Sequence, residues 1–186
     1  MNLTTPIALP LRDIVPPPEV FSFRSHLHGQ RHVARVMVHA FYLVQVTGAH
    51  DEGIRLWASV YIHDIARTHD GVSRRHGAHA CHRLESESDL KATLFRGGVR
   101  DADLDAITTA VTKHSDGEVR PPNPHWRLTA LLKDADGLDR VRLGDLDARM
   151  LRHPEARRIG CVPLTDSRRF AWSARQPSRR TRLRRP

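Results

Sequence analysis

Apolar residues recur at helical spacing along most of the chain, and no stretch shows the apolar–polar alternation with period two that a strand requires. The clearest helical pattern covers residues 28–46, where apolar residues fall three or four positions apart until Gly48 ends the run. Further helices are predicted over 51–66, 75–84, 88–95, 103–114, 125–141 and 146–152. The sequence therefore predicts an all-α fold.

The two ends of the chain differ in composition from the helical region between them. Residues 1–25 are rich in proline and lack periodicity, which predicts an extended N-terminal arm. Residues 160–186 are rich in arginine and have little apolar periodicity, which predicts a disordered basic tail. One helical domain is therefore expected over residues 26–159.

The net charge of +9 would suggest a nucleic-acid-binding protein, but the positive charge is concentrated in the tail. Residues Ser167–Pro186 contain eight arginines and no acid, so +9 minus eight leaves only +1 for the rest of the chain. We therefore expect no nucleic-acid partner for the helical domain. A polyanion-binding adaptor that acts through the tail is one alternative function.

The remaining composition favours a cytoplasmic protein. Cys81 and Cys161 form no CxxC pair and indicate no disulfide framework. Arg12 and Asp13 stand among the apolar residues of the arm, so no signal peptide is expected. No stretch reaches the roughly 18 consecutive apolar residues of a membrane-spanning helix, so no membrane partner is expected either.

Histidine is unusually frequent, with 13 in 186 residues, and neutral imidazole is the commonest metal ligand in proteins. Three His-Asp doublets occur, at His50-Asp51, His63-Asp64 and His69-Asp70. In the first, the aspartate is better explained as a helix N-cap, and the third lies in a glycine-containing loop. Only the second follows a run that looks buried, Leu56–Ile62. Because a buried carboxylate beside an imidazole is costly without a partner, this doublet predicts a metal cation.

Two further residues complete a candidate metal site with His63 and Asp64. His32 lies at the edge of the apolar face of the first predicted helix. Of three acids near the end of the predicted helix 125–141, Asp136 is expected to point inward, because it follows Leu132 by four positions. Two imidazoles and two carboxylates suit Mn, Fe, Co, Ni or Zn better than an all-oxygen Mg site.

The order of these motifs resembles the HD-domain superfamily of metal-dependent phosphohydrolases. The matching residues are His32 with Arg35-Val36 for the opening motif, His63-Asp64-Ile65 for the doublet, and Asp134-Ala135-Asp136 with Leu138 for the closing motif. The resemblance covers residues 28–150. It implies an HD-type helical bundle and hydrolysis of a phosphate ester, such as a nucleotide or another small phosphorylated metabolite.

The same resemblance implies an optional second metal on His76 and His114, with Asp64 shared between the two ions. HD nucleotidases acting on deoxynucleoside monophosphates carry a glutamate at the position of Arg67. That activity is therefore disfavoured, and acid–base work falls to Asp64, a histidine or the water that the metal activates. His28, one helical turn before His32, could support the site by contacting a metal ligand, but exposure to solvent is favoured.

Four cations flank the proposed ligands and are candidates for binding the substrate phosphate: Arg67, Arg74, Arg75 and Lys113. Two alternatives to a phosphohydrolase remain. The first is a di-iron oxygenase on the same scaffold, which also resembles some HD relatives and requires both additional histidines. The second is a metal- or nucleotide-sensing regulatory protein without turnover.

Overall fold

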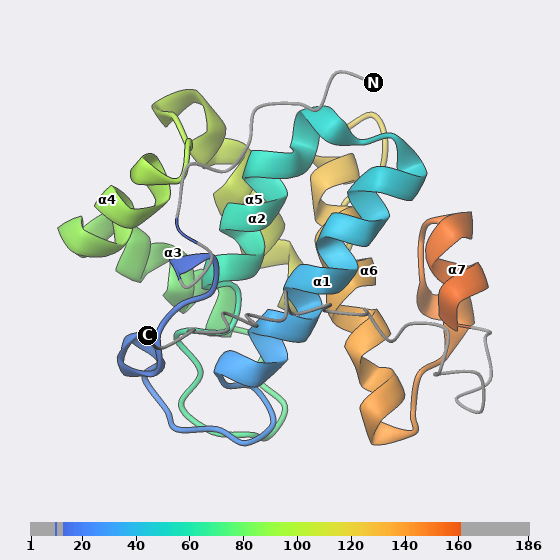
Figure 1. Cartoon of the computed structure of the whole chain (residues 1–186), viewed down its shortest axis with the longest axis horizontal. Coiled ribbons are helices and arrows are strands. Elements are labelled where there is room, and N and C mark those ends of the chain that lie inside the picture. The colour runs from blue at the N-terminus through green and yellow to red at the C-terminus, as the bar shows by residue number, and fades with distance from the viewer. Residues whose placement is uncertain (1–9, 11–12, 161–186) are drawn as a thin grey trace, which may run out of the picture.

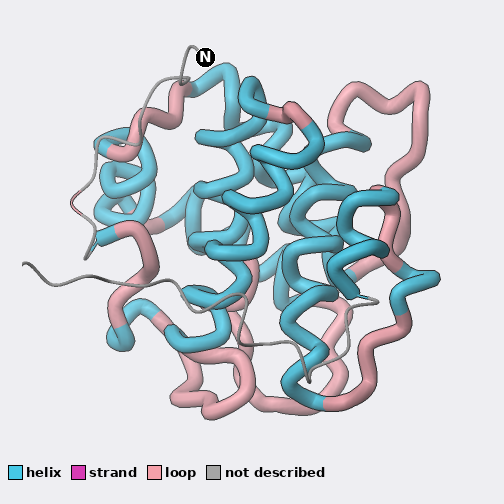
Figure 2. The backbone as a smooth tube through the Cα atoms, turned by 45° about the vertical axis from the view of Figure 1, so that its right-hand side comes forward, coloured by secondary structure: helices cyan, strands magenta, loops and turns pink. Residues whose placement is uncertain are grey.

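The computed structural model describes residue 10 and residues 13–160, and every regular element among them is a helix (Figures 1 and 2). The α-helices are α1 (Gln30–Thr47), α2 (Gly53–Ile62), α3 (His76–Ser86), α4 (Ser88–Arg96), α5 (Leu104–Ser115), α6 (Trp126–Leu138) and α7 (Pro154–Gly160). Short 3-10 helices cover Pro18–Val20, His50–Glu52, Asp101–Asp103, Asp139–Leu143 and Ala148–Met150. The all-α prediction is confirmed for this part of the chain. None of these helices combines the length and the apolar character needed to cross a membrane.

Helix α2 forms the centre of the bundle and packs against α1, α5 and α6. Every side chain from Leu56 to Ile62 is buried, as expected for a helix that is apolar on all sides. Trp57 is fully buried, and its indole N–H donates a hydrogen bond to the carbonyl of Ile14 at 2.8 Å. The chain therefore leaves α2 from the middle of the core.

Helix α1 places His32 on its buried face. Val33, Val36 and Ala40 of the same face are fully buried, and the helix ends at Gly48, whose φ of 66° is the left-handed conformation that favours glycine. The helix begins at Gln30, two residues later than the sequence pattern predicts. His28 therefore lies in the segment that leads into the helix.

The predicted helix 51–66 is longer than the helix observed. Asp51 belongs to a 3-10 turn and caps no helix; its carboxylate instead lies 3.3 Å from the guanidinium of Arg127. Helix α2 ends at Ile62, so His63 and Asp64 lie in the turn that follows it. This turn directs both side chains to the end of the bundle.

The C-terminal part of the domain also differs from the prediction. Helix α6 ends at Leu138 and continues as a 3-10 helix, and the predicted helix 146–152 is only a 3-10 turn over Ala148–Met150. Helix α7 was not predicted, because seven residues carry too little periodicity. It packs against α6 and α1.

The described part of the N-terminal arm lies along the helical core. Ile14, Val15, Val20 and Phe21 pack against it, and the backbone N–H of Ser22 donates to the carbonyl of Ile65 at 2.8 Å. This contact holds the turn that carries His63 and Asp64. The predicted tail, apart from the last residue of α7, lies outside the described residues.

Candidate metal centre

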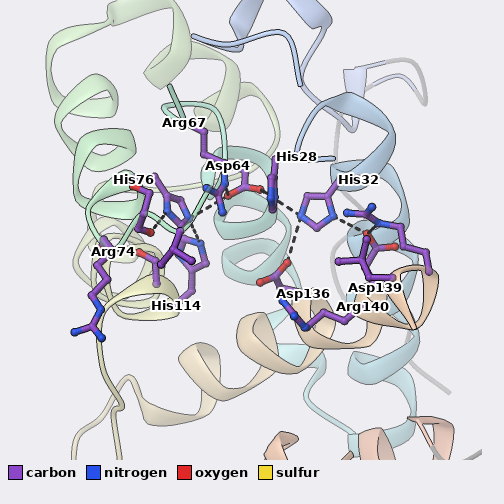
Figure 3. Close-up of a pocket in the computed structure, with 15 residues that line it drawn as sticks. His28, His32, Asp64, Arg67, Arg74, His76, His114, Asp136, Asp139 and Arg140 are labelled. Atoms are coloured by element: carbon purple, nitrogen blue, oxygen red, sulfur yellow. Dashed lines mark hydrogen bonds and ion pairs between the residues drawn. The ribbon is translucent and has the colours of Figure 1, made fainter. Parts of the chain in front are cut away.

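The six predicted ligands come from five separate segments of the chain and meet at a cavity of about 310 Å³, whose lining ligands are drawn in Figure 3. They are His32 in the first turn of α1, His63 and Asp64 after α2, His76 at the start of α3, His114 at the end of α5 and Asp136 at the end of α6. His63 is fully buried beneath the cavity, and the other five line it. Residues more than 100 positions apart are thus brought to one site.

In each of the four histidines, Nδ1 lies against a hydrogen-bond acceptor. The acceptors are the carbonyls of Val60 for His63 (2.8 Å), Ser73 for His76 (2.7 Å) and Val111 for His114, and the carboxylate of Asp139 for His32 (2.6 Å). Such an acceptor keeps a proton on Nδ1 and leaves the Nε2 lone pair for a ligand. All four rings are therefore set to bind through Nε2.

The Nε2 atoms face one another in two pairs. Those of His32 and His63 are 3.3 Å apart, and those of His76 and His114 are 2.8 Å apart. Two lone pairs at these distances repel unless a proton or a metal cation lies between them or beside both. The donor set thus fits a divalent metal.

Asp64 lies between the two histidine pairs and is only 3% exposed. One of its oxygens is 3.3 Å from Nε2 of His32, and the other is 3.1 Å from Nε2 of His76. Asp136 Oδ1 lies 3.2 Å from Nε2 of His32. Three groups that could hold a metal ion result: His32, His63 and Asp136; Asp64, His76 and His114; and His28, His32 and Asp64, which shares one residue with each of the other two.

The electrostatics of the cluster favour a cation on the His32 side. Burial lowers the pKa of His32, but the carboxylates of Asp136, Asp139 and Asp64 outweigh it and raise the pKa to about 11. Burial, together with the neighbouring His63 and His76, lowers the pKa of His114 to about 3. In the metal-free protein, His32 therefore carries a proton that a metal would displace, whereas His114 stays neutral and ready to bind.

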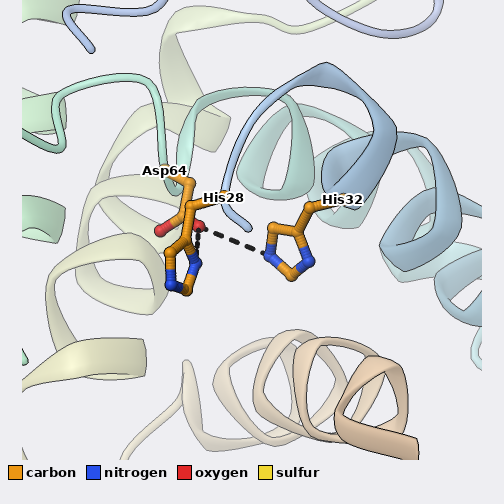
Figure 4. A group of neighbouring side chains, drawn as sticks. All are labelled: His28, His32 and Asp64. Atoms are coloured by element: carbon orange, nitrogen blue, oxygen red, sulfur yellow. Dashed lines mark hydrogen bonds and ion pairs between the residues drawn. The ribbon is translucent and has the colours of Figure 1, made fainter. Parts of the chain in front are cut away.

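His28 belongs to this cluster, contrary to the expectation that it is exposed. It is half-buried, lines the cavity, and places its Nδ1 3.0 Å from Asp64 Oδ2 (Figure 4). The hydroxyl of Ser25 accepts hydrogen bonds from the backbone N–H groups of Leu27 and His28, which fixes this segment. In the sequence, only the spacing of four residues between His28 and His32 indicated that they could lie together. That spacing could not place His28, because the helix begins at Gln30.

The three acids near the end of the predicted helix 125–141 differ in burial from the prediction. Asp136 faces the cavity, yet 38% of its side chain is exposed, whereas Asp134 and Asp139 are buried. Asp134 accepts hydrogen bonds from the backbone N–H groups of Arg152 and His153 and so anchors the segment before α7. The acid that faces the Nε2 atom of His32 is therefore the most exposed of the three.

Asp139 supports the cluster from behind His32, a role that the sequence did not indicate. Its carboxylate accepts hydrogen bonds from His32, from Arg35 at 2.6 and 3.1 Å, and from Arg142 at 2.8 Å. Arg142 also donates to the carbonyl of Leu27 at 2.7 Å, next to His28. Asp139 thus links both histidines of the N-terminal segment to the end of α6.

Four arginines line the cavity, and only two of them were predicted. Arg67 and Arg74 line it as expected, whereas Arg75 and Lys113 lie outside its lining. Arg140 and Arg142, from the 3-10 helix after α6, line it instead. That 3-10 helix turns these side chains back toward the site. The predicted α-helix, which continues to residue 141, did not indicate this direction.

Gly77 permits the close approach of α3 and α5 that brings His76 to His114. A Cβ atom at Gly77 would lie 2.1 Å from the carbonyl oxygen of Val111. We expect Gly77→Ala to push the two helices apart, to cost about 1–3 kcal/mol of stability and to weaken metal binding by His76 and His114. Urea unfolding and metal analysis of the purified variant check this.

Gly53→Ala is the matched control for this variant, because a Cβ there has no atom within 4 Å. It should not lower the unfolding midpoint, because alanine is compatible with the helical backbone of Gly53, and it should leave the metal content unchanged. A Gly77→Ala protein with unaltered stability and metal content would show that the helix contact does not limit the site.

Comparison of the chain with protein-family models, curated proteins and solved structures gives no match. The chemistry of the site is therefore inferred from the geometry of its own residues.

Proposed function

We propose that this protein is a metal-dependent phosphohydrolase of the HD type that acts on a small phosphate ester. The observation that carries the proposal is the convergence of four imidazole Nε2 atoms and two carboxylates at a cavity lined by four guanidinium groups. The mixed nitrogen and oxygen donors suit Mn, Fe, Co, Ni or Zn. Guanidinium groups are the side chains best suited to bidentate phosphate contacts.

The reaction breaks the bond between phosphorus and the ester oxygen and forms one between phosphorus and the oxygen of water, which yields an alcohol and inorganic phosphate. A bound divalent cation lowers the pKa of water and polarises a phosphoryl oxygen. Burial would raise the pKa of Asp64, but His63 and hydrogen bonds from His28, His32 and His76 hold it well below its usual range. Asp64 therefore stays ionised and can hold a cation and orient water.

The lining arginines would stabilise the negative charge that the phosphoryl group carries in the transition state. Arg67 is tied to Asp64 through Nε at 3.0 Å, so it lies directly beside the proposed site of attack. Nε2 of His28 makes no hydrogen bond to any other described residue and is available to water or substrate.

Hydrolysis of p-nitrophenyl phosphate and a panel of phosphate esters by the purified full chain tests the proposal. We expect activity with added Mn²⁺, loss of activity with a chelator, recovery when metal is restored, and one or two metal ions per chain by mass spectrometry. A folded protein that binds no metal after reconstitution would contradict the proposal.

A di-iron oxygenase is a second candidate, because His76 and His114 both lie at the cluster as that chemistry requires. Protein loaded with Fe²⁺ without air would then develop an iron-dependent visible absorption on exposure to oxygen and would consume oxygen with a substrate. Bound metal with neither oxygen consumption nor hydrolysis would instead indicate the sensing function.

A further inference from the structure

Few of the side chains that line the cavity are apolar. Among its described lining residues only Val72 and Leu143 are aliphatic, and none is Phe, Tyr or Trp. Both aliphatic side chains lie at the outside, with 94% of Val72 and 45% of Leu143 exposed. Sites for larger ligands are mostly apolar and aromatic, and nucleobases bind by stacking on aromatic rings. The lining therefore favours a small polar substrate without a base.

The charges of the lining favour a substrate with more than one anionic group. Three carboxylates of the lining, together with Asp145 on Arg140, balance the four guanidinium groups, and two divalent cations would add four positive charges. A single phosphate dianion leaves part of this positive charge unmatched. Because complementary charge governs selection at such a site, a second anionic group would be favoured.

Three of the four arginines already have an acidic partner. Arg67 is bound to Asp64, Arg142 to Asp139 and Arg140 to Asp145. The side chain of Arg74, in contrast, forms no hydrogen bond or ion pair with any other residue in the described part of the chain.

Arg74 is exposed and lies at the edge of the cavity on the side of His76 and His114 (Figure 3). Ser73 and Ser115 line the same side, and the hydroxyl of Ser115 donates a hydrogen bond to the backbone carbonyl of Arg74 at 3.1 Å. An anionic group next to the scissile phosphate would therefore meet a free guanidinium there.

We infer that the substrate is a small phosphate ester with a second anionic group and no nucleobase, and that Arg74 binds this second group. The inference rests on the proposed phosphohydrolase function and names its substrate class. The reaction is unchanged: water replaces the alcohol at phosphorus, the ester oxygen leaves with a proton, and the second anionic group is retained in the alcohol product.

Two matched substrate pairs test the inference with the Mn²⁺-loaded full chain. 3-Phosphoglycerate differs from glycerol 3-phosphate by its carboxylate, and AMP differs from ribose 5-phosphate by its base. We expect kcat/KM to be at least about tenfold higher for 3-phosphoglycerate, as a charged hydrogen bond allows. We expect no gain from the base.

Arg74→Gln should lower kcat/KM for 3-phosphoglycerate by about 10–100-fold and for glycerol 3-phosphate by much less, so that the ratio between the two collapses. Arg75→Gln is the matched control, because this neighbouring arginine is exposed and lies outside the cavity lining. It should leave the ratio unchanged. Equal rates within the first pair, equal loss for both esters in Arg74→Gln, or a tenfold preference for AMP would overturn the inference.

Binding gives a readout that does not depend on turnover. 2-Phosphoglycolate should raise the melting temperature of the Mn²⁺-loaded protein more than inorganic phosphate does, and Arg74→Gln should remove this difference. Failure to hydrolyse any ester would contradict the proposed function, and the anion site at Arg74 would then be decided by this binding measurement alone.

Discussion

Asp64→Asn is expected to remove phosphatase activity and most of the bound metal. The carboxylate of Asp64 contacts both histidine pairs, through one oxygen to His32 and through the other to His76. Asparagine keeps the volume but loses the charge that either cation would need. Hydrolysis should fall on the order of 1000-fold, the upper range for removal of one electrostatic group in an active site. Metal analysis and steady-state kinetics on the same preparation measure both effects.

Asp51→Asn provides the control for this variant, since it changes the aspartate of another His-Asp doublet. Asp51 is exposed and pairs with Arg127, away from the cavity. Its substitution should leave metal content and rate unchanged. An Asp64→Asn protein that keeps its metal and hydrolyses at the normal rate would refute the assignment of Asp64 as the shared ligand.

The candidate ligands could be selected from the sequence because the spacing of apolar residues shows which face of each helix is buried, and the ligands lie on or next to those faces. The run Leu56–Ile62 looks buried, so the doublet directly after it was predicted to lie in the core, and both His63 and Asp64 are buried. His32 followed from the apolar face of α1, and Asp136 from its spacing to Leu132. The structure places these residues at one cavity, together with His76 and His114.

The supporting residues could not be selected in this way because they lie outside regular α-helices. His28 precedes α1, and Asp139, Arg140 and Arg142 lie in the 3-10 helix after α6. Side-chain direction in such segments depends on tertiary contacts, which periodicity does not encode. Asp51 shows the same limit: its position favoured an N-cap, but a 3-10 turn and Arg127 determined its conformation.

Asp139→Asn tests whether a residue behind the cluster controls the metal affinity of the His32 side. Of the four histidines, only His32 has a side chain as the acceptor for Nδ1, so only this support can be changed by substitution. Loss of a carboxylate behind a metal-binding histidine typically lowers metal affinity about 10–100-fold. In a metal titration, the step assigned to His32, His63 and Asp136 should weaken by this factor, whereas the step assigned to His76 and His114 should not.

Asp139→Asn should also lower stability, by up to about 3 kcal/mol, because Arg35 and Arg142 lose their shared counter-charge. The two arginines are partly exposed, which keeps the loss below that of a fully buried pair. Burial would raise the pKa of Asp139, but hydrogen bonds from His32, Arg35 and Arg142 hold it well below its usual range. The stabilisation is therefore complete above about pH 4 and is lost as the pH falls, so the wild type and variant should converge in acid.

Asp105→Asn is the matched control, because Asp105 also pairs with a histidine, His125, at 2.9 Å but does so at the exposed surface. It should change neither metal step, and its effect on stability should be small because an exposed ion pair contributes little. If both variants weaken metal binding equally, the effect of Asp139 is a general loss of negative charge. If only Asp139→Asn weakens metal binding, and only by His32, His63 and Asp136, the carboxylate acts by holding the Nδ1 proton of His32. The two histidine pairs then differ in how their metal affinity is supported, because only the first depends on a side-chain acceptor.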